Sequence, residues 1–266
     1  MGLFDRFKKK EEREGAVLPS FVLLSDVSLD LDQLARDFYA DWGIELPILD
    51  DEDAEDDDFP TLVTEIDNMN VAISLMPAPV PNGEAVECAK TNFRWSDAVS
   101  AAERHEAHAL IIVMPLTKRP LAEVATLHAK LCASCLKQPN ALGIHTAGTV
   151  FDPAFYMGSA KFAVENKTFP IMNHVFFGLY SNDEGKTFSG YTFGLLTLGK
   201  QELEILDSTA GPDEVVGFLI DIASYIMNAD VTLKHGETIG FTADQKLTIA
   251  ESQGVALDGK TLKIGF

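Results

Sequence analysis

Residues 107–114 read Ala-His-Ala-Leu-Ile-Ile-Val-Met, and this apolar run predicts a buried strand. The segment that follows, 120–136, places Leu121, Val124 and Leu131 on one broad apolar face at helical spacing. A strand followed by an amphipathic helix is a unit from which layered domains are built. We therefore place this pair at the centre of the first half of the chain.

Strand and helix patterns continue on both sides of this pair. Upstream, residues 19–27 predict a strand, 29–42 predict a helix ended by Gly43, and 61–67 with 70–76 predict an antiparallel hairpin. Downstream, the predicted elements are strands over 142–150, 175–180, 191–198, 201–207, 247–250 and 262–264, and a helix over 212–227.

This order predicts an α+β fold with mixed, mostly antiparallel sheets and helices packed on one face. We expect a flexible amphipathic tail over 1–17 and two closely joined α+β halves, 18–157 and 158–266. Because no flexible linker separates the halves, one continuous sheet through both is an open alternative.

The chain is strongly acidic. Its 266 residues hold 21 Lys and Arg against 41 Asp and Glu, which gives a net charge of −20. The hydrophobic fraction of 46% excludes a disordered chain. A general nucleic-acid binder needs a basic surface to displace counterions from phosphates, so the charge argues against that role.

Eight of the nine residues in 50–58 are acidic. Such a block is typical of a solvated loop, since its charges repel one another. A Ca²⁺ or Mg²⁺ site is the alternative, because these ions prefer oxygen ligands. The block lacks the mid-loop Gly and terminal Glu of a calcium-binding helical hand, so we expect a solvated loop.

The cysteines and the amino terminus indicate a cytoplasmic protein. Three cysteines do not make a disulfide framework and fit a reducing compartment. No segment has the length and apolarity of a signal peptide or a membrane span. Residues 1–14 combine Leu3, Phe4 and Phe7 with several lysines, so weak peripheral membrane contact through this segment is a further expectation.

Histidines and cysteines suggest one candidate site. Residues 95–105 predict a helix, so His105 and His108 lie where this helix meets the predicted strand 107–114, and His128, Cys132 and Cys135 share a helix face. Together they could supply ligands for zinc, but the pattern lacks an established zinc spacing, and small buried cysteines are common in cores. We expect no metal and no cofactor.

Two carboxylates suggest a second candidate site. Glu202 and Glu204 lie two apart on a predicted strand, so their side chains point to one face. Partly buried, such a pair could perform general acid–base catalysis. The alternative is a solvated sheet face with Leu203 and Ile205 in the core, which the strict alternation favours. The candidate cluster is therefore His105, His108, Glu202 and Glu204, with no assigned catalytic residue.

A family resemblance lies in the second half. The run Gly190-Tyr-Thr-Phe-Gly-Leu-Leu-Thr-Leu-Gly-Lys-Gln-Glu-Leu-Glu204, the predicted helix 212–227 and the segment 233–240 resemble bacterial domain-of-unknown-function family 4261, most clearly over 160–266. The resemblance implies no activity, cofactor or catalytic residue. At a distance it is similar to families of immunity or accessory proteins found beside bacterial toxins.

Two functions remain as hypotheses. The first is a non-catalytic, immunity-like or accessory interaction protein whose acidic surface attracts a basic protein partner. The second is an enzyme of unrecognised type with a His/Glu cleft. The charge and the lack of a catalytic motif favour the first.

Overall fold

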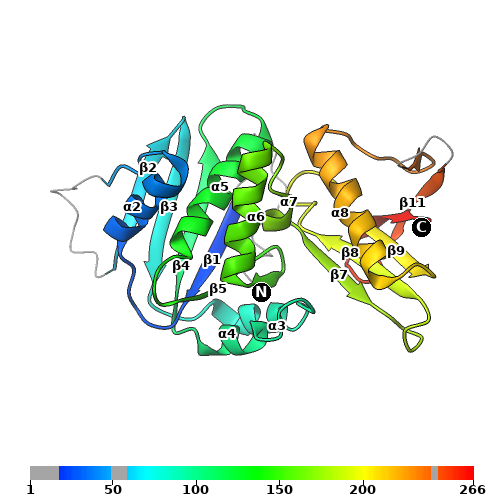
Figure 1. The fold of residues 1–266 in the computed structure, drawn as a ribbon, viewed down its shortest axis with the longest axis horizontal. Helices are drawn as coiled ribbons and strands as arrows, with labels where there is room; N and C mark the ends of the chain where they lie inside the picture. Colours follow the sequence, from blue (N-terminus) through cyan, green and yellow to red (C-terminus); the bar gives the residue numbers. More distant parts are fainter. Residues whose placement is uncertain (1–17, 49–58, 241–244) are drawn as a thin grey trace. The chain divides into compact units, whose positions relative to one another are not determined.

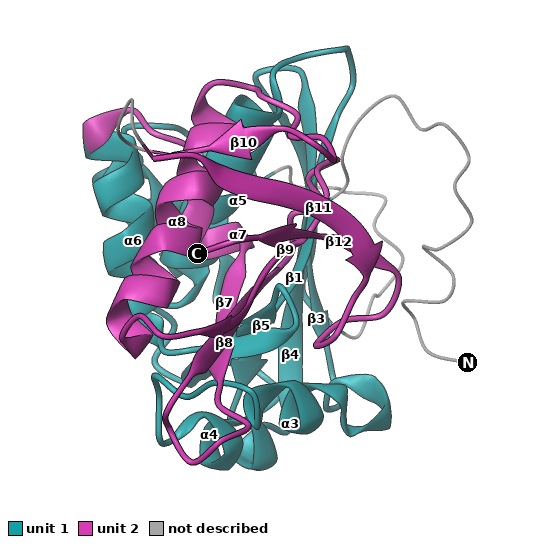
Figure 2. Cartoon of the chain, turned by 90° about the vertical axis from the view of Figure 1, so that its right-hand side faces the viewer, with its two compact units in different colours: residues 1–165 teal, residues 166–266 magenta. Residues whose placement is uncertain are grey.

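The computed structural model describes residues 18–48, 59–240 and 245–266, and the chain forms two compact units (Figure 1). Unit 1 comprises residues 1–165 and unit 2 residues 166–266 (Figure 2). Each unit is built on its own six-stranded sheet. The idea of one continuous sheet through both halves is therefore wrong, while the α+β class with mostly antiparallel sheets is confirmed.

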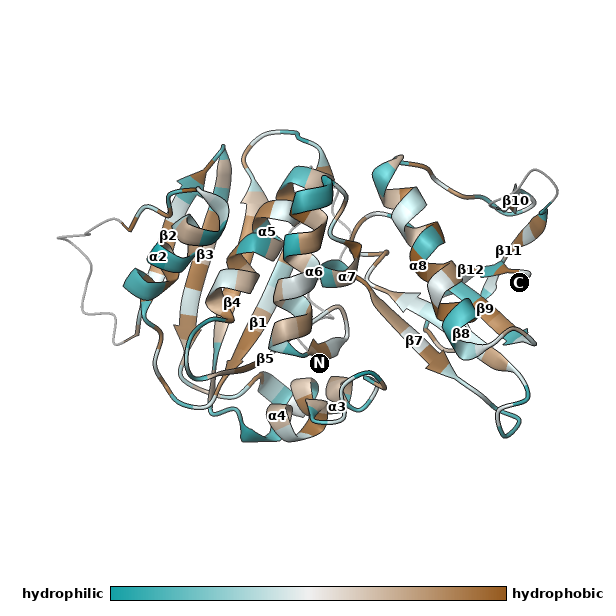
Figure 3. Cartoon of the chain, viewed as in Figure 1, coloured by the Kyte–Doolittle hydropathy of each residue, from teal (hydrophilic) through white to brown (hydrophobic). Residues whose placement is uncertain are grey.

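The sheet of unit 1 has the strand order β2-β3-β4-β1-β5-β6 and is antiparallel throughout. Its strands are β1 Leu18–Leu24, β2 Thr61–Ile66, β3 Met69–Met76, β4 Ala107–Pro115, β5 Ala141–Thr146 and β6 Thr149–Phe151. The predicted strand 107–114 is β4, between β3 and β1, where apolar residues dominate in Figure 3.

The helices of unit 1 cover parts of both sheet faces. They are α2 Leu31–Trp42, α3 Glu84–Ala89, α4 Ala98–Arg104, α5 Leu121–Cys135 and α6 Pro153–Asn166, with the short 3₁₀ turn η1 Pro81–Gly83 before α3. Helix α5 packs against β4 and β1, and α5 and α6 cross in front of the strands in Figure 1. Helices α3 and α4 pack on the opposite face, where Phe21 and Leu23 of β1 join their core.

Helix α2 shows how local sequence sets an element. Asp30 accepts a hydrogen bond from the Gln33 N–H (2.8 Å), which satisfies a free donor of the first turn. Gly43 ends the helix with φ 63°, a left-handed conformation that glycine adopts without steric cost. Leu34 and Phe38 are fully buried beneath it. Both ends agree with the prediction to within two residues.

Unit 2 places one long helix against its sheet. Its elements are α7 Ile171–His174, β7 Phe176–Tyr180, β8 Phe188–Phe193, β9 Leu203–Ser208, α8 Pro212–Asn228, β10 Thr238–Ile239, β11 Leu247–Gln253 and β12 Lys260–Ile264. The strand order is β10-β11-β12-β9-β8-β7, and only the β12–β9 pairing is parallel among the described strands. Helix α8 packs against β7, β8 and β9.

Two predicted strands have other boundaries in the structure, and one long helix was not predicted. The strand expected over 142–150 is the hairpin β5–β6, because Ala147 and Gly148 turn the chain with φ 47° and 68°. The strand expected over 191–198 ends at Phe193, because Gly194 has φ 126°. Helix α6, 153–166, was not predicted at all.

Candidate functional site

The sheet of unit 1 brings two histidines to one end of one face. Cross-strand pairing sets Phe21 of β1 opposite His145 of β5, and Leu23 opposite His108 of β4. Since residues two apart on a strand share a face, His108 and His145 flank Phe21. The Phe21 ring stacks on His145 (5.7 Å between centroids) and meets His108 edge-on (5.4 Å).

His105 and His108 hold the loop that follows β3. The Nε2 atom of His105 accepts a hydrogen bond from the Val80 N–H (2.8 Å), and its Nδ1 donates to the Ala102 carbonyl. His108 donates from Nδ1 to the Ala78 carbonyl (2.8 Å). Burial lowers the pKa of both imidazoles, against the effect of these carbonyls. Both ring nitrogens of His105 are therefore already hydrogen-bonded to backbone groups.

Sequence reasoning missed a second group beside these histidines. Glu84 and Cys88 lie one turn apart on α3, and His145 approaches them from β5. The Glu84 Oε1 and His145 Nε2 atoms are 3.9 Å apart, and one ligand atom from each of the three residues lies within 4.8 Å of the others. The spacing of Glu84 and Cys88 is visible in the sequence, but nothing there connects it with His145.

The zinc set considered from the sequence does not assemble. Cys132 lies on α5 with its Sγ 3.6 Å from the Nε2 atom of His128. Helix α5 packs on the sheet face opposite Phe21 and His108, so these side chains do not join His105 and His108. Burial raises the pKa of Cys135 to about 12 and that of Cys132 further, which makes both thiols inert core groups.

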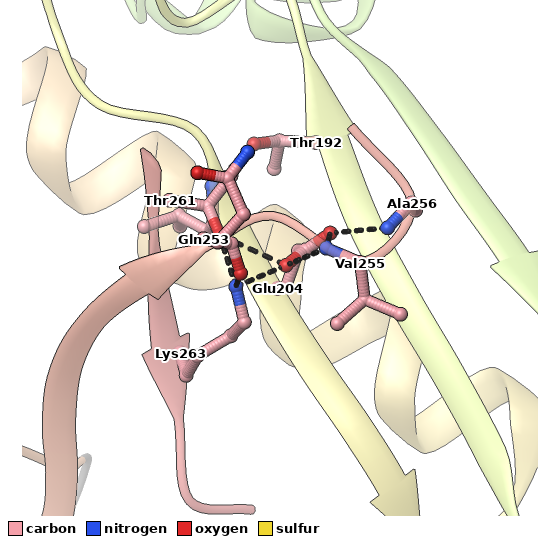
Figure 4. Close-up of polar contacts among 8 residues, drawn as sticks. Thr192, Glu204, Gln253, Val255, Ala256, Thr261 and Lys263 are labelled. Atoms are coloured by element: carbon pink, nitrogen blue, oxygen red, sulfur yellow. Dashed lines mark hydrogen bonds and ion pairs between the residues drawn. The ribbon is translucent and has the colours of Figure 1, made fainter. Parts of the chain in front are cut away.

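In unit 2 the Glu204 carboxylate is fully buried, and Figure 4 shows the polar groups around it. It accepts hydrogen bonds from the Val255 and Ala256 amides (3.1 and 2.8 Å) and from the Thr261 hydroxyl (2.8 Å). The Lys263 Nζ atom lies 2.5 Å from Oε2, because the parallel β9–β12 pairing sets these two residues side by side. Four donors thus surround one carboxylate.

The electrostatics of Glu204 follow from these contacts. Burial acts to raise the pKa of this carboxyl, but Lys263, with the Ala256 and Thr261 donors, outweighs burial and holds the pKa below its ordinary value. The group is therefore ionised at neutral pH. Lys263 also donates to the Gln253 carbonyl (3.0 Å), so the ion pair ties β9, β12 and the turn after β11 together.

Glu202, which lies just before β9, performs a similar task for another turn. It accepts from the Thr192 hydroxyl (2.7 Å) and from the Gly194 and Leu196 amides (2.8 and 2.9 Å). Burial raises the pKa of Glu202, against the effect of these donors. The carboxylate thereby closes the turn 194–199 that follows β8.

Glu202→Ala is expected to lower the free energy of unfolding by about 2–4 kcal/mol, because it leaves several buried donors without an acceptor. Glu202→Gln is expected to cost under about 1 kcal/mol, since the amide oxygen can still accept from the turn. Urea unfolding followed by circular dichroism measures both. Equal losses for the two variants would contradict this role.

The predicted candidate cluster divides between the two units. His105 and His108 belong to unit 1, and Glu202 and Glu204 belong to unit 2. The favoured expectation that the two glutamates line a solvated face is wrong, since Glu202 is 9% exposed and Glu204 0%. The turn 194–199 covers Glu202, and the turn after β11 with strand β12 covers Glu204, which the alternation of β9 alone does not reveal. The acidic block 50–58 lies outside the described residues.

The described elements define an α+β protein of two units, each with its own sheet and helices. The second unit contains buried carboxylates. Residues 191–265, from β8 to the end of β12, match the model of a family described as Domain of unknown function (DUF4261). The match confirms the resemblance inferred from the sequence and includes Glu202, Glu204 and Lys263. No curated protein and no solved structure shows a significant match to the chain. Within the described residues, none of the helices has the length and apolarity required to cross a membrane.

Proposed function

We propose that the protein is a non-catalytic, immunity-like or accessory interaction protein that binds a basic protein partner on unit 1, on the part of the sheet face carrying α3 and α4 that no described helix covers. The observation that carries this proposal is a row of side chains across four strands. The register aligns Val63 of β2, Ala72 of β3, Ile112 of β4 and Pro19 of β1. We call this row and its neighbours Glu65, Asn70 and Met114 the open face.

The open face combines apolar contact area with solvent access. Val63 is 62% exposed and Met114 is 42% exposed, whereas the residues on the other side of the same strands are buried. Pro19, Ala72 and Ile112 between them are partly exposed. Accessible apolar side chains that cross several strands are typical of protein-binding surfaces. The open face therefore supports a protein partner.

Charge supports a basic partner. Glu65 lies on the open face, Asp67 follows it, and the acidic block 50–58 directly precedes β2 in the sequence. The whole chain carries a net charge of −20. A positively charged partner would be attracted electrostatically and then held by apolar contact.

The alternative of an enzyme with a His/Glu cleft has less support. Both nitrogens of His105 bind the backbone, and Glu202 and Glu204 accept several hydrogen bonds each from their own unit. A general base needs a lone pair directed at substrate. These contacts favour positioning roles for the three side chains.

The location is also a proposal. Cys88, Cys132 and Cys135 are all free thiols, which supports a reducing, cytoplasmic setting. We keep peripheral membrane contact through residues 1–14 as a prediction, and that segment lies outside the described residues.

Val63→Lys is expected to weaken partner binding more than about tenfold, because it removes the most exposed apolar side chain of the open face and repels a basic surface. Val255→Lys is the matched control, since Val255 has the same 62% exposure but lies in unit 2. The purified chain is immobilised, exposed to lysate of its source cells at low and high salt, and captured proteins are quantified.

The proposal expects a stoichiometric, basic protein whose capture falls with salt and with Val63→Lys but not with Val255→Lys. Capture of an acidic protein or of a second copy of this chain would overturn it. So would capture that both variants reduce equally, or no stoichiometric partner.

A further inference from the structure

Helix α3 presents two metal-ligand types on one side. The chain enters this helix through Asn82 and Gly83, whose φ angles of 59° and 66° reverse its direction after the loop held by His105 and His108. Glu84 is in the first turn and Cys88 is four residues later, so their side chains lie one above the other. Both side chains are partly buried.

His145 completes the group from the sheet. Its Nδ1 donates to the Thr149 carbonyl (3.0 Å), which leaves the Nε2 lone pair directed towards Glu84, 3.9 Å away. The imidazole is 1% exposed and its ring is fixed by stacking on Phe21. A backbone carbonyl that fixes the tautomer and direction of an imidazole is the usual outer contact of a metal-binding histidine.

The electrostatic setting favours a cation. The Nε2 lone pair and the Glu84 carboxylate are two acceptors that face each other. Burial, together with Glu84 and Glu87, raises the pKa of Cys88 to about 11. A bound cation would lie between the acceptors and offset the negative charge around the thiol.

We propose that Glu84, Cys88 and His145 bind one divalent transition-metal ion of the zinc type, with solvent in the remaining position. The three ligand atoms, all from described residues, lie within 4.8 Å of one another. Bonds of about 2.0–2.3 Å require ligand atoms roughly 3.5 Å apart, so small movements of the partly exposed Glu84 and Cys88 side chains would complete the site.

The donor set selects the metal class. Thiolate sulfur and imidazole nitrogen are ligands of Zn²⁺ and Co²⁺, whereas Ca²⁺ and Mg²⁺ prefer oxygen alone. Three protein ligands from a helix and a strand would fix α3 to β5. The ion would therefore stabilise unit 1 beside the open face, and its binding does not depend on the proposed partner.

The test uses the full chain without an affinity tag after dialysis against a chelator. Titration with Co²⁺ is expected to produce a thiolate-to-cobalt charge-transfer band that saturates at one ion per chain, and Zn²⁺ is expected to displace it. Bound Zn²⁺ is also expected to raise the melting temperature, because it binds the folded chain.

The variants distinguish this site from other groups. Cys88→Ser is expected to abolish the band, and Glu84→Gln and His145→Gln are expected to weaken Zn²⁺ binding more than about tenfold. Glu87→Gln is the matched control, since this glutamate is on the same helix but pairs with Lys90 at the surface. Circular dichroism of the metal-free variants confirms that each is folded.

Three results would overturn the proposal. The first is a folded wild-type chain that shows no charge-transfer band with excess Co²⁺. The second is a band that persists in Cys88→Ser and disappears in Cys135→Ser. The third is Zn²⁺ binding that Glu87→Gln weakens as much as Glu84→Gln does, which would mean adventitious surface binding only.

Discussion

Lys263→Met is expected to lower the free energy of unfolding by about 3–5 kcal/mol at neutral pH, because it leaves the buried Glu204 carboxylate without its cation. Glu204 is fully buried and the Lys263 side chain is only 15% exposed, so water cannot replace the lost partner fully. Urea unfolding followed by circular dichroism measures the effect. The double variant Glu204→Gln/Lys263→Met is expected to recover part of the loss.

The control for this prediction is Lys260→Met on the same strand. Lys260 pairs with Glu251 at 2.6 Å, but its side chain is 69% exposed, and exposed ion pairs contribute little to stability. Equal losses of unfolding free energy for Lys260→Met and Lys263→Met would contradict the argument that the buried Glu204 carboxylate depends on Lys263.

The same pair predicts a pH dependence. The pKa of Glu204 is lowered from its ordinary value of 4.5 in the folded chain, so its charge stabilises the fold above that pH. This contribution is lost as the pH falls through the lowered pKa. The difference in stability between wild type and Lys263→Met is therefore expected to shrink below about pH 4. A difference that stays constant down to pH 2 would contradict this explanation.

Gly194→Ala is also expected to have a large effect, and to lower the free energy of unfolding by about 4 kcal/mol. Its φ of 126° is in a region that side chains disfavour, and an added Cβ would lie 2.3 Å from the His174 carbonyl oxygen. Strain and a clash with rigid backbone each cost about 1–3 kcal/mol. The substitution would also displace an amide that binds Glu202.

Gly199→Ala separates the two causes. Gly199 lies in the same turn with φ 77°, but nothing lies within 4 Å of an added Cβ. Its substitution therefore carries the backbone strain alone, about 1–2 kcal/mol. If both alanine variants lose the same stability by urea unfolding, the contact with His174 has no role.

Much of the fold could be predicted because the decisive signals are local. The apolar run 107–114, the hairpin runs 61–67 and 70–76, and the Asp30 and Gly43 ends of α2 all appear at their predicted places. The errors arise where a single residue changes the chain direction. Gly194 ends β8 early because its φ is positive, and glycine spacing alone does not reveal that angle.

The candidate sites were predicted less well, since burial of a polar residue depends on remote segments. The spacing of Glu202 and Glu204 predicted that they share one face of a strand, but only Glu204 lies within β9. Glu202 is covered by the turn after β8, and Glu204 by strand β12 and the turn before it, which the alternation in β9 does not contain. The solvated face was therefore the natural expectation, and it is wrong.

The sequence by itself determined the acidic charge, the α+β class and the match to DUF4261, because composition and periodicity are properties of the chain alone. The tertiary structure alone decided which titratable side chains meet. It pairs the Glu204 carboxylate with the Lys263 ammonium group, and it places His145 beside Glu84 and Cys88. Strand pairing and helix packing bring together segments that are remote along the chain. Only these long-range contacts set the hydrogen bonding, burial and charge of each group.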